Sequence, residues 1–261
     1  EARLLIINAD DFGMCHAIND AVSQALAQGL LRSTTLMVPC PWALHAMHML
    51  AAHPEMRFGV HLTVLADWVD YRWGPVMPRE KVPSLLDKTG YFYNFDGMRH
   101  FLAQVNLAEL ELEFRAQIET VLTAGLTPTH LDWHALRLTG HPAILALMQR
   151  LAIDYGLALR VIGQDWIATV QRQGLPTIDY DFLDSYLLDP VDKTAQYAQL
   201  LRSLPPGLSE WAVHPGLANA ELRAIDRTGY QVRQSDFDFL MSPTAQALVQ
   251  EEGIILLDYS A

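Results

Sequence analysis

The chain has 261 residues and a formal net charge of -12, which argues against a general affinity for nucleic acid or anionic lipid and favours a neutral or weakly charged ligand. Its residues are 51% hydrophobic, but the apolar runs are short and interrupted, so we expect no membrane span. Cys15 and Cys40 are the only cysteines and form no CxxC pair, which argues against a disulfide framework and a thiolate metal site and suits a cytoplasmic location.

The first predicted element is a strand that ends in two carboxylates. The apolar run Leu4-Leu5-Ile6-Ile7 continues into Asn8-Ala9-Asp10-Asp11-Phe12-Gly13, a pattern that predicts a buried parallel strand with a charged carboxyl end. Neighbouring residues of a strand point to different sides, so one aspartate could bind a metal while the other acts as a base. The alternative is a strand-to-helix turn in which Asp10 or Asp11 lies near the helix N-terminus.

The next elements repeat the alternation of strand and helix. Apolar periodicity predicts helices over residues 17–26 and 42–52 and strands over residues 33–38 and 58–63. The second of these strands places His61 at or near its end. A histidine there is either a ligand or a hydrogen-bonded core residue.

A long loop, at about residues 64–105, interrupts the alternation. Between Asp67 and Gly97 it is rich in Trp, Tyr, Pro and Gly, and it is too aromatic for a disordered segment. We expect it to form a wall or lid over the site, with Trp68 and Trp73 available to stack on sugar faces. The alternative is a small satellite core packed on the rim of the fold.

The densest group of metal-capable residues follows a predicted helix over residues 107–124. In Thr129-His130-Leu131-Asp132-Trp133-His134, the alternation places His130, Asp132 and His134 on one face of an extended segment. Three such residues aligned in this way are hard to explain as packing. The alternative is a hydrogen-bonded network of histidine and aspartate.

The second half of the chain continues with less regular elements. The pattern predicts helices over 142–155, 195–203 and 235–252 with a break at Pro243, and strands over 158–162, 210–214 and 254–257. Residues 163–190 are ambiguous, and 182–188 are either a strand or another rim loop. Arg160 is expected at the mouth of the site, where it could hold a substrate oxygen, hold Asp10 or form a rim salt bridge. His214 ends the strand at 210–214 and precedes a Pro-Gly turn.

Seven or eight strands separated by helices predict an α/β fold with parallel strands and right-handed crossovers. An open doubly wound sheet is one arrangement, but the sequence has no Gly-x-Gly-x-x-Gly turn and no Walker-type loop. Polar groups that recur at strand ends along the chain favour a (β/α) barrel, because those ends meet at one mouth. With no composition shift to mark a boundary, residues 1–261 are predicted to form a single domain.

These polar groups suggest metal-assisted hydrolysis. One carboxylate and two imidazoles can bind a divalent ion and leave positions open for water and substrate. Such an ion activates water and polarises a carbonyl group, so hydrolysis of a carbonyl-type bond follows. The second aspartate would be the base, and a separate histidine would protonate the leaving amine.

Four segments resemble the YdjC-like carbohydrate deacetylases, a family that includes chitooligosaccharide and hopanoid-biosynthesis deacetylases. They are Asn8-Ala9-Asp10-Asp11-Phe12-Gly13, Gly59-Val60-His61-Leu62-Thr63, Thr129-His130-Leu131-Asp132-Trp133-His134 and Val213-His214-Pro215-Gly216. The resemblance implies an irregular barrel, here of seven strands, of the glycoside hydrolase and deacetylase type. It also implies removal of the acetyl group from an N-acetylated amino sugar with one divalent metal ion. That ion is Mg by the resemblance, while Zn or another transition metal is compatible with it.

The resemblance also implies roles for individual residues. Asp11, His61 and His134 match the metal ligands, Asp10 matches the catalytic base, and His214 matches the general acid. His130 and Asp132 would orient the ligands and the base. The candidate substrate contacts are Arg160, Trp68, Trp73 and Trp133. Many members continue after the last ligand with a histidine-rich run, whereas this chain has Ala135-Leu136-Arg137-Leu138, which argues against a chitobiose-type substrate.

The function expected is therefore hydrolysis of a small-molecule N-acetylated sugar, with no nucleic acid as partner and no membrane span. Two alternatives stay open: a non-catalytic sugar-binding barrel, and a metal hydrolase that acts on a phosphate or another amide. Hydrophobic surface at the rim is compatible with a homodimer.

Overall fold

The computed structural model describes residues 2–138, 140–188 and 192–261. Within these ranges the strands follow the apolar runs of the sequence. They are β1 (Arg3–Phe12), β2 (Ser33–Leu36), β3 (Phe58–Leu62), β4 (His130–Trp133), β5 (Ala158–Leu159), β6 (Leu183–Asp184), β7 (Gly207–Val213) and β8 (Ile254–Leu257).

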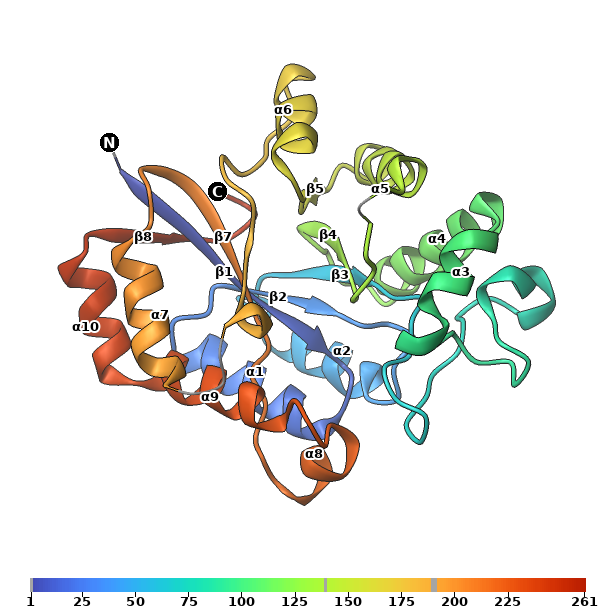
Figure 1. Cartoon of the computed structure of the whole chain (residues 1–261). Coiled ribbons are helices and arrows are strands. Elements are labelled where there is room, and N and C mark those ends of the chain that lie inside the picture. The colour runs from blue at the N-terminus through green and yellow to red at the C-terminus, as the bar shows by residue number, and fades with distance from the viewer. Residues whose placement is uncertain (1, 139, 189–191) are drawn as a thin grey trace.

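Helices connect the strands. The α-helices are α1 (His16–Gln28), α2 (Ala43–Ala52), α3 (Met98–Gln104), α4 (Leu107–Thr123), α5 (Pro142–Tyr155), α6 (Gln164–Arg172), α7 (Lys193–Arg202), α8 (Ala220–Ile225), α9 (Tyr230–Met241) and α10 (Pro243–Glu251). Short 3-10 helices are η1 (Arg79–Lys81), η2 (Pro83–Leu85), η3 (Phe95–Gly97) and η4 (Ser185–Leu187). Figure 1 shows α1, α7, α9 and α10 beside β1 and β7, and α3, α4 and α5 beside the β3 to β5 part of the sheet.

The strands form one parallel sheet with β1 at its centre. The order is β5-β4-β3-β2-β1-β7-β6, and β8 also pairs with β1. Along one edge of β1, residues Arg3 to Ala9 pair with β7. Along the other edge, Arg3 to Ile6 pair with β8, and residues from Asn8 onwards pair with β2. The sheet curls without closing, since β5 and β6 end the order and the described strands show no pairing between them. The predicted irregular (β/α) barrel fold is confirmed.

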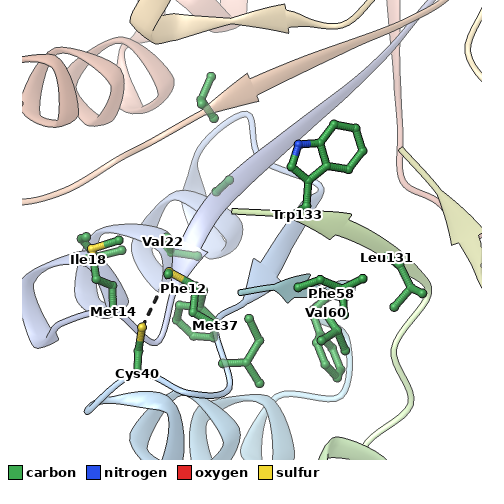
Figure 2. Packing of buried hydrophobic residues seen from close by; sticks show 14 of the residues in the cluster. Phe12, Met14, Ile18, Val22, Met37, Cys40, Phe58, Val60, Leu131 and Trp133 are labelled. Atoms are coloured by element: carbon green, nitrogen blue, oxygen red, sulfur yellow. Dashed lines mark hydrogen bonds between the residues drawn. The ribbon is translucent and has the colours of Figure 1, made fainter. Parts of the chain in front are cut away.

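A single large core joins the curled sheet to its helices. Figure 2 shows Phe12 of β1 beside Met14, Ile18 and Met37, while Val60 and Leu131 extend the same cluster along the sheet. The apolar face of α1 recurs every three or four residues, as expected of a helix packed on a sheet. This continuous core holds the carboxyl ends of β1, β3 and β4 in fixed positions relative to one another.

An irregularity at the end of β1 determines how its two aspartates point. Ala9 pairs with Thr34 and Phe12 with Leu36, so β1 contains one extra residue relative to β2. Asp11 lies in this bulge with φ of 70°, a left-handed conformation that a non-glycine residue seldom adopts. A regular strand would send Asp10 and Asp11 to opposite faces, as the sequence predicted. Both instead line the same cavity.

The loop at residues 64–105 combines both interpretations offered for it. Trp68 and Phe95 line the cavity, whereas Trp73, Phe92 and Phe101 are buried in the main core rather than in a satellite core. The boundary at 105 was wrong, because residues 98–104 form the helix α3. This helix is only two turns long, too short for its apolar period to stand out beside an aromatic loop.

The remaining differences lie in the second half of the chain. The strand predicted over 158–162 is only the two residues of β5, and 182–188 contain the two-residue β6 followed by η4. The ambiguous segment contains α6, and its last residues, 189 and 190, lie outside the described residues. The break at Pro243 is confirmed, because the Ser242 side chain caps α10 there.

Two predictions from composition agree with the structure. Cys15 and Cys40 are both free and buried. No helix in the described part of the chain has the length and apolarity needed to cross a membrane. The single domain over 1–261, the cytoplasmic location and the homodimer remain predictions.

Gly59 on β3 offers a test of the close packing inside the sheet. A Cβ atom there would lie 2.5 Å from the His130 carbonyl oxygen and 2.6 Å from the His130 ring. We expect Gly59→Ala to lower the free energy of unfolding by about 1–3 kcal/mol, measured by urea denaturation, because backbone must shift to admit the methyl group. The control is Gly74→Ala, where the nearest atom is 3.5 Å away. Equal stability of the two variants would contradict this packing.

Candidate metal and catalytic site

A cavity of about 580 Å³ opens where the strands end. Its lining has a polar part, here called the floor, and a largely aromatic part, here called the walls. The polar lining includes Asp10, Asp11, His61, His134, Arg160 and His214, and the aromatic lining includes Trp68, Phe95, Trp133, Phe182 and Tyr186. The structure therefore brings Asp10 and His214, which are 204 positions apart in the sequence, into one cavity.

Three of these side chains converge on one point. Asp11 Oδ1 lies 3.4 Å from His61 Nε2 and 3.1 Å from His134 Nδ1, and all three residues are buried. Their donor atoms lie within 4.8 Å of one another, close enough to share one ion. This is the ligand set that the resemblance implied.

Each imidazole of this group is fixed from behind by a further carboxylate. His61 Nδ1 lies 2.7 Å from Asp132 Oδ1, and His134 Nε2 lies 2.6 Å from Asp67 Oδ1. Histidines that bind metals typically donate their second N–H to a carboxylate, which orients the ring. Asp132 is thus where the sequence predicted an orienting residue. Asp67 was missed, because a single aspartate in a long loop carries no periodic signal.

The electric field of these carboxylates favours a cation. Burial lowers the pKa of His61, but the charges of Asp132 and Asp10 outweigh it and raise the pKa to about 10. Burial opposes the charge of His134 in the same way, and Asp67 and Asp11 raise its pKa to about 9. The same negative field favours a divalent cation, which must replace the protons on these imidazoles in order to bind.

A second group of possible ligands, Asp10, His61 and Asp132, is already neutralised by the protein. Arg160 Nη1 lies 2.7 Å from Asp10 Oδ2 and 3.0 Å from Asp132 Oδ2. Arg160 thus compensates both carboxylates of this group, whereas Asp11 Oδ1 faces the two imidazoles. The Asp11 group is therefore the better candidate for a metal.

Asp10 is held ionised beside that candidate metal position. Arg160 donates to both of its oxygens, at 2.7 and 2.8 Å, and Asn8 Nδ2 donates to Oδ1 at 2.8 Å. Burial raises the pKa of Asp10, but the charge and hydrogen bonds of Arg160 outweigh it and hold the pKa below its usual range. Of the roles considered for Arg160, the structure shows contact with Asp10, in a buried position rather than on the rim.

His214, the first residue after β7, faces Asp10. Its Nε2 lies 3.9 Å from Asp10 Oδ2, while its Nδ1 lies 3.0 Å from the Ser185 hydroxyl and 3.9 Å from Asp184 Oδ1. The His214 backbone N–H donates to Asp236 Oδ2. These contacts orient Nε2 towards the cavity.

Arg233 on α9 was not identified from the sequence. Its Nη2 lies 2.8 Å from Asp11 Oδ2, and its Nε donates to Asp226 Oδ2 at 3.0 Å. Burial raises the pKa of Asp11, but the charge of Arg233 and the hydrogen bonds from His134 and His61 lower it well below its usual range. An arginine on an amphipathic helix is usually a surface residue, so no sequence signal distinguished this one.

Three predicted site residues do not line the cavity: Asp132, which contacts His61 from behind, and also His130 and Trp73. The predicted contact of His130 with the ligands or the base is not found: its Nδ1 lies 2.9 Å from Thr129 Oγ1, and its ring stacks on Tyr259. Trp73 was predicted to contact sugar, but it is buried behind the cavity and its Nε1 donates to the Leu65 carbonyl. Trp68 and Trp133 do line the cavity.

Comparison with known proteins places the chain in a family. Residues 4–251 match the family model described as YdjC-like protein. The chain belongs to the YdjC-like family. The predicted family is confirmed over nearly the whole chain.

Similar proteins have the name carbohydrate deacetylase. A protein of that name from Geobacillus stearothermophilus is 31% identical, over 98% of this chain and 97% of its own. Another from Enterococcus faecalis is 30% identical, over 99% and 98%. A crystal structure from Enterococcus faecalis, of a proposed cellobiose-phosphate cleavage protein, has a TM-score of 0.86 and 30% identity, and covers 100% of this chain and 98% of that one.

Substitutions behind and within the Asp11 group test its metal binding. We expect Asp67→Asn to weaken binding of Zn²⁺ by about 10–100-fold, because His134 loses its carboxylate partner. His134→Ala should weaken it further, since it removes a donor atom. Isothermal titration calorimetry of the metal-free proteins measures both effects. His53→Ala is the control, because His53 is exposed and pairs with Glu55. Wild-type affinity in both site variants would contradict the assignment.

Proposed function

We propose that this protein is a metal-dependent hydrolase that removes the acetyl group from an N-acetylated amino sugar. One observation carries the proposal: Asp10 and His214 face each other at 3.9 Å beside the Asp11, His61 and His134 group. A base, an acid and a candidate metal position thus meet at one floor. The carbohydrate deacetylase names of the relatives support the same reaction class.

Each residue has a distinct role in the proposed reaction. Asp11, His61 and His134 would hold a divalent ion, which supplies Lewis-acid polarisation of the acetyl carbonyl and lowers the pKa of the attacking water. Asp10, kept ionised by Arg160, accepts the proton of that water. His214 Nε2 donates a proton to the sugar nitrogen as the amide bond breaks, and the Ser185 hydroxyl holds the opposite ring nitrogen in place.

The donor atoms favour a particular kind of metal. Two imidazole nitrogens and one carboxylate suit zinc or another transition metal, whereas Mg prefers oxygen ligands. The resemblance implied Mg. From the donor set we propose a transition metal as the more active ion.

The cavity walls suit a neutral sugar. Trp68, Trp133 and Phe182 offer flat apolar faces beside the polar floor, an arrangement typical of pockets that bind small molecules. The carboxylates of the floor already face the buried Arg160 and Arg233. A bound divalent ion would add to this compensation and leave little net charge to recognise in the sugar.

A substrate assay tests the proposed function directly. We expect the metal-free protein, reloaded with Zn²⁺, Co²⁺ or Mg²⁺ in turn, to release acetate from N-acetylglucosamine derivatives and no phosphate from sugar phosphates. Phosphate release would instead support a phosphate hydrolase. Sugar binding in calorimetry without any acetate, at full metal loading, would support a sugar-binding protein.

Replacement of the proposed base should separate turnover from metal binding. We expect Asp10→Asn to lower kcat by about 10²–10⁴-fold, the usual contribution of a general base, while the affinity for Zn²⁺ stays near that of the wild type. Acetate release and calorimetry on the same preparation give both values. Undiminished turnover would refute Asp10 as the base.

The leaving group reveals whether His214 acts as the acid. We expect His214→Asn to lower kcat by about 10²–10⁴-fold on an N-acetylated amino sugar, because the departing amine needs a proton. An aryl acetate ester should lose far less activity, since its phenolate leaves without protonation. Equal losses on the two substrates would be inconsistent with proton donation by His214.

A further inference from the structure

Glu210 is a buried carboxylate in contact with the proposed catalytic machinery but not with the cavity. It lies on β7, four residues before His214, and is 0% exposed. Its Oε1 accepts a hydrogen bond from Arg160 Nε at 2.6 Å. Since Glu210 is not among the cavity-lining residues, it would not touch a substrate.

Charge balance alone does not explain this residue. Arg160 already pairs with Asp10 and Asp132, so a third carboxylate leaves the cluster with excess negative charge. Burial of an ionised carboxylate costs several kcal/mol unless its partners offset it. Burial accordingly raises the pKa of Glu210 above its usual value, although Arg160 opposes the shift. Such a costly placement calls for a role in geometry.

The geometry of the guanidinium group supplies that role. Its Nη1 and Nη2 atoms hold the two oxygens of Asp10, and its Nε is held by Glu210. A guanidinium group is planar, so an acceptor at Nε fixes the direction of the fork formed by the two Nη atoms. With Nε free, the fork could tilt and Asp10 could move with it.

Glu210 is itself backed by a stacked pair of rings. Tyr259, which follows β8, stacks on His130 of β4 with ring centroids 3.6 Å apart and an interplanar angle of 12°. In Figure 1 this last segment turns from β8 towards β4 and β5. Tyr259 is fully buried and lies close enough to Glu210 for burial and the Glu210 carboxylate together to raise the pKa of its hydroxyl.

From these contacts we infer that Glu210 is a positioning residue: it holds Arg160 at Nε, so that Arg160 keeps Asp10 in place for proton transfer, and Tyr259 on His130 closes the space behind it. The inference rests on the role proposed above for Asp10. His130 would then support the site through its stacking on Tyr259, which lies beside Glu210, rather than through the metal ligands.

Kinetics of two variants test the inference. Glu210→Leu leaves Arg160 Nε without an acceptor, and we expect kcat to fall by about 100-fold, the cost of a misplacement of about 1 Å. KM and the affinity for Zn²⁺ should stay within about twofold of the wild type, because neither substrate nor ligands touch Glu210. Glu210→Gln should restore most of kcat, since its amide oxygen can still accept from Nε.

A matched control separates positioning from packing. Glu113 on α4 is also 0% exposed, but its carboxylate accepts from the backbone N–H groups of Val76 and Met77, away from Arg160. We expect Glu113→Leu to lower the melting temperature without changing kcat of the folded protein. Wild-type kcat in Glu210→Leu, or an equal fall in both variants, would overturn the inference.

Crystal structures of the variants give a readout that does not depend on turnover. We expect the paired contacts between Arg160 and Asp10 to be lost in Glu210→Leu and kept in Glu210→Gln. If they persist in Glu210→Leu, the positioning role is wrong. Should Glu210→Leu fail to fold, Tyr259→Leu takes its place, because it removes the ring that stacks on His130. We expect kcat of this variant to fall at constant KM, and an unchanged kcat overturns the role. If the wild-type protein releases no acetate, the proposed function is wrong, but the crystal structures still test whether Glu210 positions Arg160.

Discussion

The structure depends on the placement of two adjacent aspartates, Asp10 and Asp11, in one buried cavity. A regular strand would separate their side chains, and only the bulge with Asp11 in the left-handed conformation turns both to the same side. Backbone conformations of this kind cost of order 1–3 kcal/mol and persist where the surrounding structure enforces them. The apolar core around β1 provides that support.

Buried charge is the second constraint, and arginines satisfy most of it. Arg160 compensates Asp10, and Arg233 compensates Asp11 from the opposite side. Loss of one partner of such a pair typically costs 3–5 kcal/mol, because the other charge stays buried. Each aspartate therefore has its own arginine, an arrangement compatible with the proposed roles of Asp11 as a metal ligand and Asp10 as a base.

Much of the fold was predictable because its signals are local. The strands that became β1, β2, β3, β4 and β7 were recognisable as apolar runs bounded by Gly or Pro, and the helices around them by their period. The short helices α3 and α8 were not predicted, and the bounds of β5 and β6 were not found, since two to seven residues hold too little periodicity to compete with neighbouring loops. Family likeness added the roles of His61, His134 and His214, which spacing alone left open.

The sequence by itself determined the alternation of strand and helix, the polar residues at the strand ends and the family. Tertiary structure alone decided which of those residues meet. It brought Asp67 to His134, Arg233 to Asp11 and Glu210 to Arg160, and it moved His130 and Trp73 away from the cavity. These pairings join segments far apart in the chain, and they depend on the curl of the sheet and on one extra residue in β1, neither of which leaves a periodic mark in the sequence.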